Sequence, residues 1–358
     1  MSVTPLSPAE PGRERPWLGP ILFVVMAMGF AWLVALPLFF TGGLRSPLFL
    51  PLTILMMLTP GLSALLVSRY FEGFQNPWPQ LGAWPLRPVG RLIAYVAIAL
   101  VGMILIVLVA LPIGSLFGVY HADFQNFSGY QEAMRVSLEQ QGSLGEVPIE
   151  GLVGAQFVGA FIGAFVNIVP AAGSELGWRG YLFPRVFRRF GAIPAILITG
   201  VLWGLWYSPL LVLGYNYEHT GPLVSILLMI VFCVIIGALL SWVRLRSDSV
   251  WPAVIGQGAL ASAMGVGAMN ASVGFSYVFL EAGQTVDTTQ ATVLGWSGWI
   301  VPLILIVILV LLGGFRPVRS ATVPEAPAPT PLPAPVQDAP RAELPAEPEP
   351  TSEFPAQP

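Results

Sequence analysis

The sequence predicts an all-α protein, a polytopic bundle of about eight transmembrane helices with both termini in the cytoplasm. Three observations predict this class: the composition, a series of long apolar runs, and an alternation of arginine-rich loops. Hydrophobic residues make up 55% of the chain, charged residues only 10%, and the mean hydropathy is +0.74. A soluble domain carries about 25% charged residues. The chain therefore has too little polar surface for a globule in water, and we expect the lipid bilayer, not a nucleic acid, as its surroundings.

Eight apolar runs are long enough to cross a hydrocarbon core of about 30 Å. The runs are 18–40, 47–67, 92–117, 152–172, 192–214, 222–243, 250–269 and 293–315. The first follows Arg13 and Arg15, is too long for the core of a signal peptide, and ends without a small-residue cleavage site. It is therefore interpreted as a membrane span.

The loops between these runs alternate in arginine content, and cytoplasmic loops are the arginine-rich ones. The loops after the second, fourth, sixth and eighth runs hold Arg69, Arg87, Arg91, Arg179, Arg185, Arg188, Arg189, Arg244, Arg246, Arg316 and Arg319. The intervening loops are poor in arginine and often acidic. This pattern predicts cytoplasmic termini and a multi-pass protein of the plasma membrane.

The ends and the longest loop complete the predicted domain organisation. Residues 1–16 form a short disordered N-terminus, and residues 317–358 form a Pro-, Ala- and Glu-rich disordered cytoplasmic tail, which a proline-binding module would recognise. Residues 17–316 form the transmembrane domain. Within the loop 119–150, the stretch YQEAMRVSLEQQ is expected to form a short amphipathic helix.

Ionisable and polar groups near the spans are the candidate functional residues, because charge at membrane depth is costly. Glu175 and Arg179 are spaced i, i+4 and pair if the fourth helix continues through SELGWRGYLFP; a structural ion pair is the alternative to a catalytic one. Tyr207 follows Trp203 at the same spacing, which by itself predicts only an aromatic face. Gln257 needs an interhelical hydrogen bond inside the membrane.

An ordinary zinc site is not expected from these residues. Such a site needs about three ligands from His, Cys, Asp and Glu. The only histidines, His121 and His219, fall in loops on the side opposite Glu175, and Cys233 is the single cysteine. No cofactor is therefore expected.

Three segments, taken in order, resemble the motifs of the CPBP family, the intramembrane metalloproteases that include CAAX prenyl proteases and bacteriocin-processing proteins. SELGWRGYLFPRVFRRFGA resembles the family's EExxxR motif followed by GYLxPRL. GVLWGLWYSPLLVLGYN resembles FxxxH within LWGLWHLPL, and SDSVWPAVIGQGALASA resembles HxxxN within SLWPAVLxHALxN. The resemblance covers residues 170–265, which we interpret as a CPBP-like core.

The resemblance implies which residues would be catalytic, and most are replaced here. In the family the first glutamate activates water, the histidines bind a metal, usually zinc, or stabilise the oxyanion, and the asparagine assists them. The second glutamate and the arginine are kept as Glu175 and Arg179. The other positions, in motif order, hold Ser174, Tyr207, Gln257 and Ala261, while Trp203 replaces the motif-two phenylalanine.

The replacements favour a pseudoenzyme over a working protease. Metal-assisted hydrolysis needs a ligand set and a carboxylate base, and members of a catalytic constellation act as a unit. We therefore expect a catalytically inactive family member whose cavity binds or shields a transmembrane or lipidated peptide. Ser174, Tyr207 and Gln257 are expected to line that cavity as hydrogen-bonding groups. One alternative is an active endopeptidase with Glu175 as base and Tyr207 and Gln257 as oxyanion donors. The other is a membrane transporter, which is less favoured because the sequence shows no broken helix pair.

Overall fold

The computed structural model describes residues 17–86, 88–140, 148–265 and 274–316, and the main secondary structure of this part of the chain is helical. The predicted disordered ends, 1–16 and 317–358, lie outside the described residues, as does Arg87. The helices are α1 (Leu18–Ala35), α2 (Phe49–Leu66), α3 (Val89–Leu116), α4 (Ser128–Gln140), α5 (Ile149–Val166), α6 (Ile168–Glu175), α7 (Phe183–Phe190), α8 (Ala192–Trp206), α9 (Ser208–Leu211), α10 (Pro222–Ser247), α11 (Trp251–Ala263), α12 (Phe275–Val278) and α13 (Trp296–Leu311). The all-α prediction is confirmed.

Five helical segments among the described residues are long and apolar enough to cross a membrane. They are Leu18–Phe40, Phe49–Phe71, Val89–Leu116, Ile149–Val166 and Pro222–Ser247. The other three predicted spans contain the shorter helices α8, α11 and α13, of 15, 13 and 16 residues. At a rise of 1.5 Å per residue these measure only about 20–24 Å. A polytopic helical bundle is thus confirmed, while the orientation of the termini stays a prediction.

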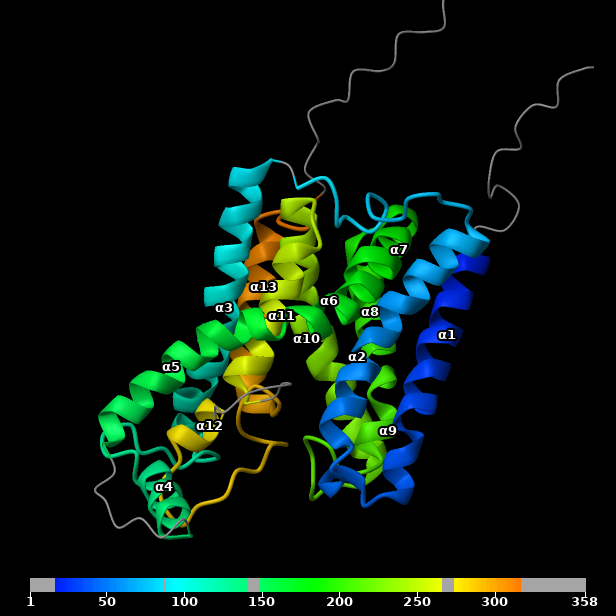
Figure 1. Ribbon diagram of the computed structural model, residues 1–358. Coiled ribbons are helices and arrows are strands. Elements are labelled where there is room, and N and C mark those ends of the chain that lie inside the picture. Colours follow the sequence, from blue (N-terminus) through cyan, green and yellow to red (C-terminus); the bar gives the residue numbers. More distant parts are fainter. Residues whose placement is uncertain (1–16, 87, 141–147, 266–273, 317–358) are drawn as a thin grey trace, which may run out of the picture. The chain divides into compact units, whose positions relative to one another are not determined.

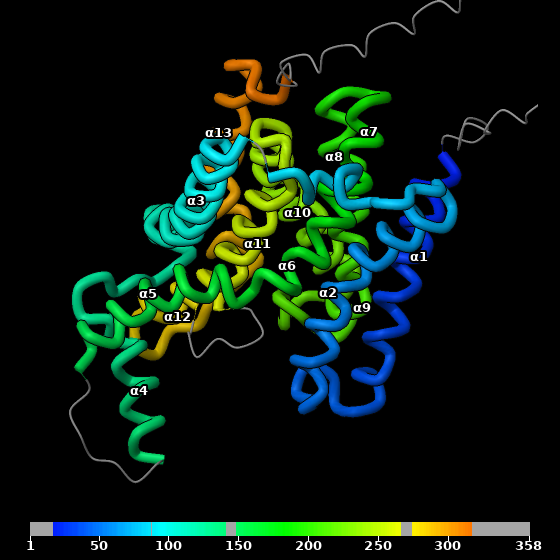
Figure 2. Tube along the Cα trace, turned by 45° about the horizontal axis from the view of Figure 1, so that its top comes forward, coloured from blue at the N-terminus to red at the C-terminus, as the bar shows by residue number. Residues whose placement is uncertain are grey.

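The helices form two groups joined through the centre (Figure 1). In the first group, α1 packs on α2 and α7 packs on α8. In the second, α11 packs on α3 and α5, and α13 packs on α3. The two groups meet where α10 contacts both α8 and α11, and where α6 contacts both α2 and α11; Figure 2 shows α6 between α2 and α11.

The predicted fourth span, 152–172, is not one continuous helix. Helix α5 ends at Val166, Asn167 has non-helical φ and ψ of −81° and 7°, and α6 starts at Ile168. Pro170 explains the break, because a proline ring in a continuous helix would clash with the carbonyl four residues earlier, that of Val166. In the first turn of α6 the proline is tolerated, since its missing N–H would have no partner there. After α6 the chain continues as the π-helical segment Leu176–Leu182.

The predicted fifth span, 192–214, is broken in the same way. Helix α8 ends at Trp206 and the short helix α9 starts at Ser208, with Tyr207 between them. Pro209 stands in the first turn of α9 and would clash with the carbonyl of Leu205 in a continuous helix. The pattern of apolar residues did not reveal these breaks, because both halves of each span are equally apolar.

The short helix predicted in the longest loop is confirmed as α4. Its preceding turn is organised by Asp123, whose carboxylate accepts backbone N–H groups of Gln125, Asn126 and Ser128 at 3.1, 2.8 and 3.2 Å. An antiparallel bridge between Ala122 and Leu280 ties this loop to the segment after α12. This part of the protein packs at the end of α3, away from the motif-one segment.

Candidate functional site

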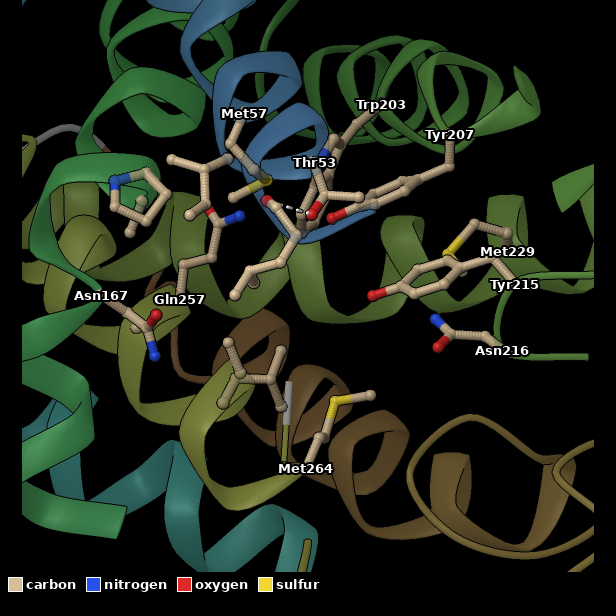
Figure 3. Close-up of a pocket in the computed structure, with 18 of the residues that line it drawn as sticks. Thr53, Met57, Asn167, Trp203, Tyr207, Tyr215, Asn216, Met229, Gln257 and Met264 are labelled. Atoms are coloured by element: carbon tan, nitrogen blue, oxygen red, sulfur yellow. Dashed lines mark hydrogen bonds between the residues drawn. The ribbon is translucent and has the colours of Figure 1, made fainter. Parts of the chain in front are cut away.

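A cavity of about 310 Å³ lies between the two helix groups (Figure 3). It is lined by Phe49, Leu50, Thr53, Ile54, Met57, Asn167, Pro170, Ala171, Trp203, Tyr207, Tyr215, Asn216, Met229, Phe232, Gln257, Gly258, Leu260, Ala261, Met264 and Gly265. Five of these residues are aromatic, three are methionine and none is charged. The walls are therefore suited to an apolar occupant that makes a few polar contacts.

The broken helices and the end of a third helix meet at this cavity. Asn167 separates α5 from α6, Tyr207 separates α8 from α9, and Met264 follows the last residue of α11; all three line the cavity. Irregular backbone at membrane depth is tolerated where protein buries it or where it lines a cavity. The breaks thus place both polar side chains and helix ends around the same space.

The motif-two and motif-three positions line this cavity together. Tyr207 packs against Trp206 and Tyr215, with ring centroids 4.8 and 6.4 Å away, and Trp203 lies at 6.3 Å. Gln257 and Ala261 stand one turn apart on α11 and face the cavity from the other side. The resemblance therefore identifies positions that are far apart in the sequence but line the same cavity.

Gln257 carries an unsatisfied acceptor in this cavity. Its side chain is only 5% exposed, and within the described residues its Oε1 atom accepts no hydrogen bond. The interhelical hydrogen bond expected for this amide is therefore not made by its oxygen within that part of the chain. A buried amide oxygen without a donor costs free energy, so an occupant with an N–H or O–H group would stabilise it.

The motif-one positions behave differently, and the expectation that Ser174 lines the cavity is wrong. Neither Ser174 nor Glu175 is among the lining residues, and both side chains are fully buried. Ser174 lies one helical turn beyond the lining residues Pro170 and Ala171, on the same face of α6. Within the described residues its hydroxyl oxygen has no hydrogen-bond partner.

Glu175 and Arg179 form the predicted ion pair. Arg179 Nη1 donates to Glu175 Oε1 at 2.7 Å, and neither side chain is exposed. The guanidinium carbon also lies 4.1 Å from the ring centroid of Trp203, and Nη2 packs so close to α10 that a Cβ on Gly237 would come within 2.9 Å. The pair thus connects the motif-one segment to α8 and α10.

Several lining residues were not expected from the sequence. Asn167, Tyr215 and Asn216 lie between helices, and Thr53 and Met57 belong to α2, outside the CPBP-like core. Pro170 was the available signal for Asn167, because it predicts a helix boundary shortly before it. No signal pointed to α2, whose apolar run looks like any other span.

The side chains at the family's catalytic positions do not fit a zinc ion. Zinc is held by thiolates, imidazoles and carboxylates, whereas these positions offer a serine, a phenol, an amide and a methyl group. Within the described residues no three His, Cys, Asp or Glu side chains lie close enough together to hold a metal ion. Glu175, the nearest carboxylate, is engaged by Arg179.

Two comparisons confirm the resemblance. Residues 155–263 match the sequence model of the family described as type II CAAX prenyl endopeptidase Rce1-like. The chain is 31% identical over 85 residues to CAAX prenyl protease 2 of Methanococcus maripaludis, a match that covers 24% of this chain and 31% of that protein. Both findings support the CPBP family of CAAX-protease-like membrane proteins, and the region matched by the family model contributes most, but not all, of the cavity wall.

Proposed function

We propose that this CAAX-protease-like membrane protein is a pseudoprotease, whose cavity binds a transmembrane or lipidated peptide without cleaving it. The observation that carries the proposal is the composition of the cavity wall at the family's catalytic positions. Tyr207, Gln257 and Ala261 all line the cavity and none supplies a metal ligand of the usual kind or a base. A cavity at these motif positions supports peptide binding, and the replacement of the family's reactive groups supports the absence of cleavage.

The chemistry of the cavity supports a lipidated peptide as occupant. The three methionines adapt to irregular apolar shapes, as a flexible hydrocarbon chain requires. A peptide N–H group would satisfy the unpaired oxygen of Gln257. One occupant with both an apolar chain and a peptide bond therefore matches both parts of the wall.

The active-endopeptidase alternative receives less support from the position of Glu175. A general base must lie within hydrogen-bond reach of the proton that it removes. Glu175 is fully buried, paired with Arg179 at 2.7 Å, and absent from the cavity wall. The remaining groups, Tyr207 and Gln257, would bind an oxyanion but would not activate water.

A transporter is the second candidate, and a specific observation favours it. Discontinuous helices whose breaks surround a central site are typical of secondary transporters. The breaks at Asn167 and Tyr207, which the sequence did not reveal, both line the cavity. The test is solute flux into proteoliposomes. Flux that is abolished when the cavity is filled would favour a transporter and reject the pseudoprotease proposal.

Binding is tested with a fluorescent farnesylated peptide that ends in a CAAX sequence, added to the purified full-length protein. We expect saturable binding and an intact peptide. Ala261→Phe fills the cavity and should weaken binding about tenfold or more, about 1.4 kcal/mol. Ala97→Phe adds the same ring on the exposed face of α3 and should leave binding unchanged. Cleavage of the peptide by the unmodified protein would reject the pseudoprotease proposal.

The loss of chemistry is tested by restoration. The variant Ser174→Glu, Tyr207→His, Gln257→His, Ala261→Asn should bind zinc and cleave the peptide if the backbone keeps the family geometry. A matched variant that retains Ser174 should bind zinc without cleavage, because the water-activating carboxylate is missing. Equal cleavage by both variants would show that position 174 is not the base.

We also propose a location and a further partner. The protein would act in the plasma membrane as a multi-pass protein, and a proline-binding module would dock on residues 317–358. Microscopy of a tagged full-length chain checks the first expectation. Pull-down with the isolated tail peptide and with a version whose prolines are replaced by alanine checks the second.

A further inference from the structure

A second site lies at the end of α7, outside the cavity. A surface hollow of about 430 Å³ is lined by Arg185, Arg188, Arg189 and Phe190. Three of its four lining residues are arginines, so the hollow is strongly positive. Helix α7 ends one residue before Gly191, whose φ of 82° turns the chain into α8.

The positive charge of this hollow is only partly neutralised by the protein. Glu72 is the acidic partner, and Tyr181 donates to its Oε1 at 2.7 Å while Arg185 donates to both carboxylate oxygens. The hydrogen bonds that Glu72 accepts thus come from Arg185 and Tyr181, and its charge also acts on nearby Arg188. Within the described part of the chain, Arg188 and Arg189 form no ion pair, and both are exposed. Two arginines therefore remain available to an external anion.

The neighbouring aromatic residues place this hollow at the membrane surface. Phe190 stacks on Trp17, with ring centroids 5.5 Å apart and planes at 18°, and the guanidinium of Arg189 lies 5.9 Å from the Trp17 ring. Trp17 immediately precedes the first membrane-spanning segment, Leu18–Phe40. Tryptophan is enriched where the hydrocarbon meets the headgroups. This position is expected to bring Arg188 and Arg189 to the depth of lipid phosphates.

We propose that the α7 hollow binds the phosphate of an anionic glycerophospholipid. Arg188 and Arg189 donate hydrogen bonds to the phosphate oxygens, a geometry that arginine favours because its planar fork matches two oxygens at once. Phe190 is 51% exposed and Leu18 43% exposed, so an apolar surface beside the arginines faces the glycerol and acyl chains. The site is independent of the proposed peptide cavity.

The test measures lipid binding to the purified full-length protein in a neutral detergent. Phosphatidylglycerol and phosphatidylcholine of the same chain length are titrated, and bound lipid is measured by native mass spectrometry. We expect a preference for phosphatidylglycerol that Arg188→Gln with Arg189→Gln removes. Each arginine near an anionic surface contributes about fivefold in affinity, so the loss of both should be about 25-fold.

Two controls separate phosphate binding from net charge and from folding. Arg45→Gln with Arg135→Gln removes two exposed charges from other surfaces and should keep the preference. Arg188→Lys with Arg189→Lys keeps the charge and should retain part of the affinity. If the two arginines had a purely structural role, the lysine variant would bind the lipid no better than the glutamine variant. Equal binding of the two lipids by the unmodified protein, or an equal loss in the Arg45 and Arg135 variant, would overturn the proposal. Displacement of the lipid by inorganic phosphate at the same concentration would assign the hollow to a soluble anion instead.

Discussion

The motif-one segment and the cavity wall carry parts of the same family motifs, yet they differ in what surrounds their side chains. Glu175 and Arg179 are fully buried and pair with each other, and Arg179 packs against Trp203 and α10. Tyr207, Gln257 and Ala261 instead line the cavity. The kept residues are those that hold helices together, and the replaced residues are Ser174 and those that face the cavity. Packing and chemistry can therefore be separated in this protein by substitution.

The largest expected effect is the loss of the buried ion pair. Arg179→Gln leaves the Glu175 carboxylate buried without its partner, which should lower the free energy of unfolding by about 3–5 kcal/mol. Unfolding in a mixed detergent, titrated with sodium dodecyl sulfate, measures this change. Arg135→Gln breaks an exposed pair with Glu132 and Glu139 and serves as the control, with little effect expected. Equal effects of the two substitutions would mean that the Glu175 pair does not hold the helices.

A smaller loss is expected from disturbing the close contact of α8 with α10. Gly200 and Gly204 are one turn apart, and a Cβ at Gly204 would come within 2.5 Å of the Ile230 Cα atom. Gly204→Ala should therefore force the helices apart and cost about 1–3 kcal/mol. A Cβ at Gly102 of α3 would have no neighbour within 4 Å, so Gly102→Ala is the matched control. The same unfolding titration compares the two variants.

Cavity residues should show the opposite behaviour, with function affected more than stability. Gln257→Met removes the unpaired buried oxygen at nearly constant volume, so the free energy of unfolding should stay within about 1 kcal/mol of the unmodified protein. Binding of the farnesylated peptide should weaken by about tenfold, because a hydrogen bond is lost. A loss of stability as large as that of Arg179→Gln would show that Gln257 stabilises the packing of the helices.

The smallest effect should come from Asp123, which lies outside both regions. Hydrogen bonds from the backbone N–H of Asn126 and from Ser128 lower the pKa of Asp123 to about 2. A lowered pKa means that this carboxylate stabilises the loop above about pH 4 and that the stabilisation is lost as the pH falls toward 2. Asp123→Asn should cost about 1 kcal/mol or less at neutral pH. Hydrogen exchange of α4 at pH 7 measures it, and exchange in the cavity helices should not change.

The sequence predicted the helical class and the cavity-facing family positions well, and the helix breaks poorly. Apolar composition is a property of each segment alone, so eight runs were recognised without any knowledge of packing. Pro170 and Pro209 mark both breaks, but the apolar residues on either side conceal them. Ser174 was expected to line the cavity, but it is fully buried and is not among the lining residues.

By itself, the sequence determined that the chain lies in a membrane, that its helices carry CPBP-like motifs, and that four family positions hold neutral side chains. These are local properties, set by composition and by the order of residues along the chain. The tertiary structure decided which of those positions share a cavity, that α2 supplies one of its walls, and that Glu175 is occupied by Arg179. Such contacts join residues far apart in sequence, and they depend on where proline interrupts each helix and on how closely the glycines let helices approach.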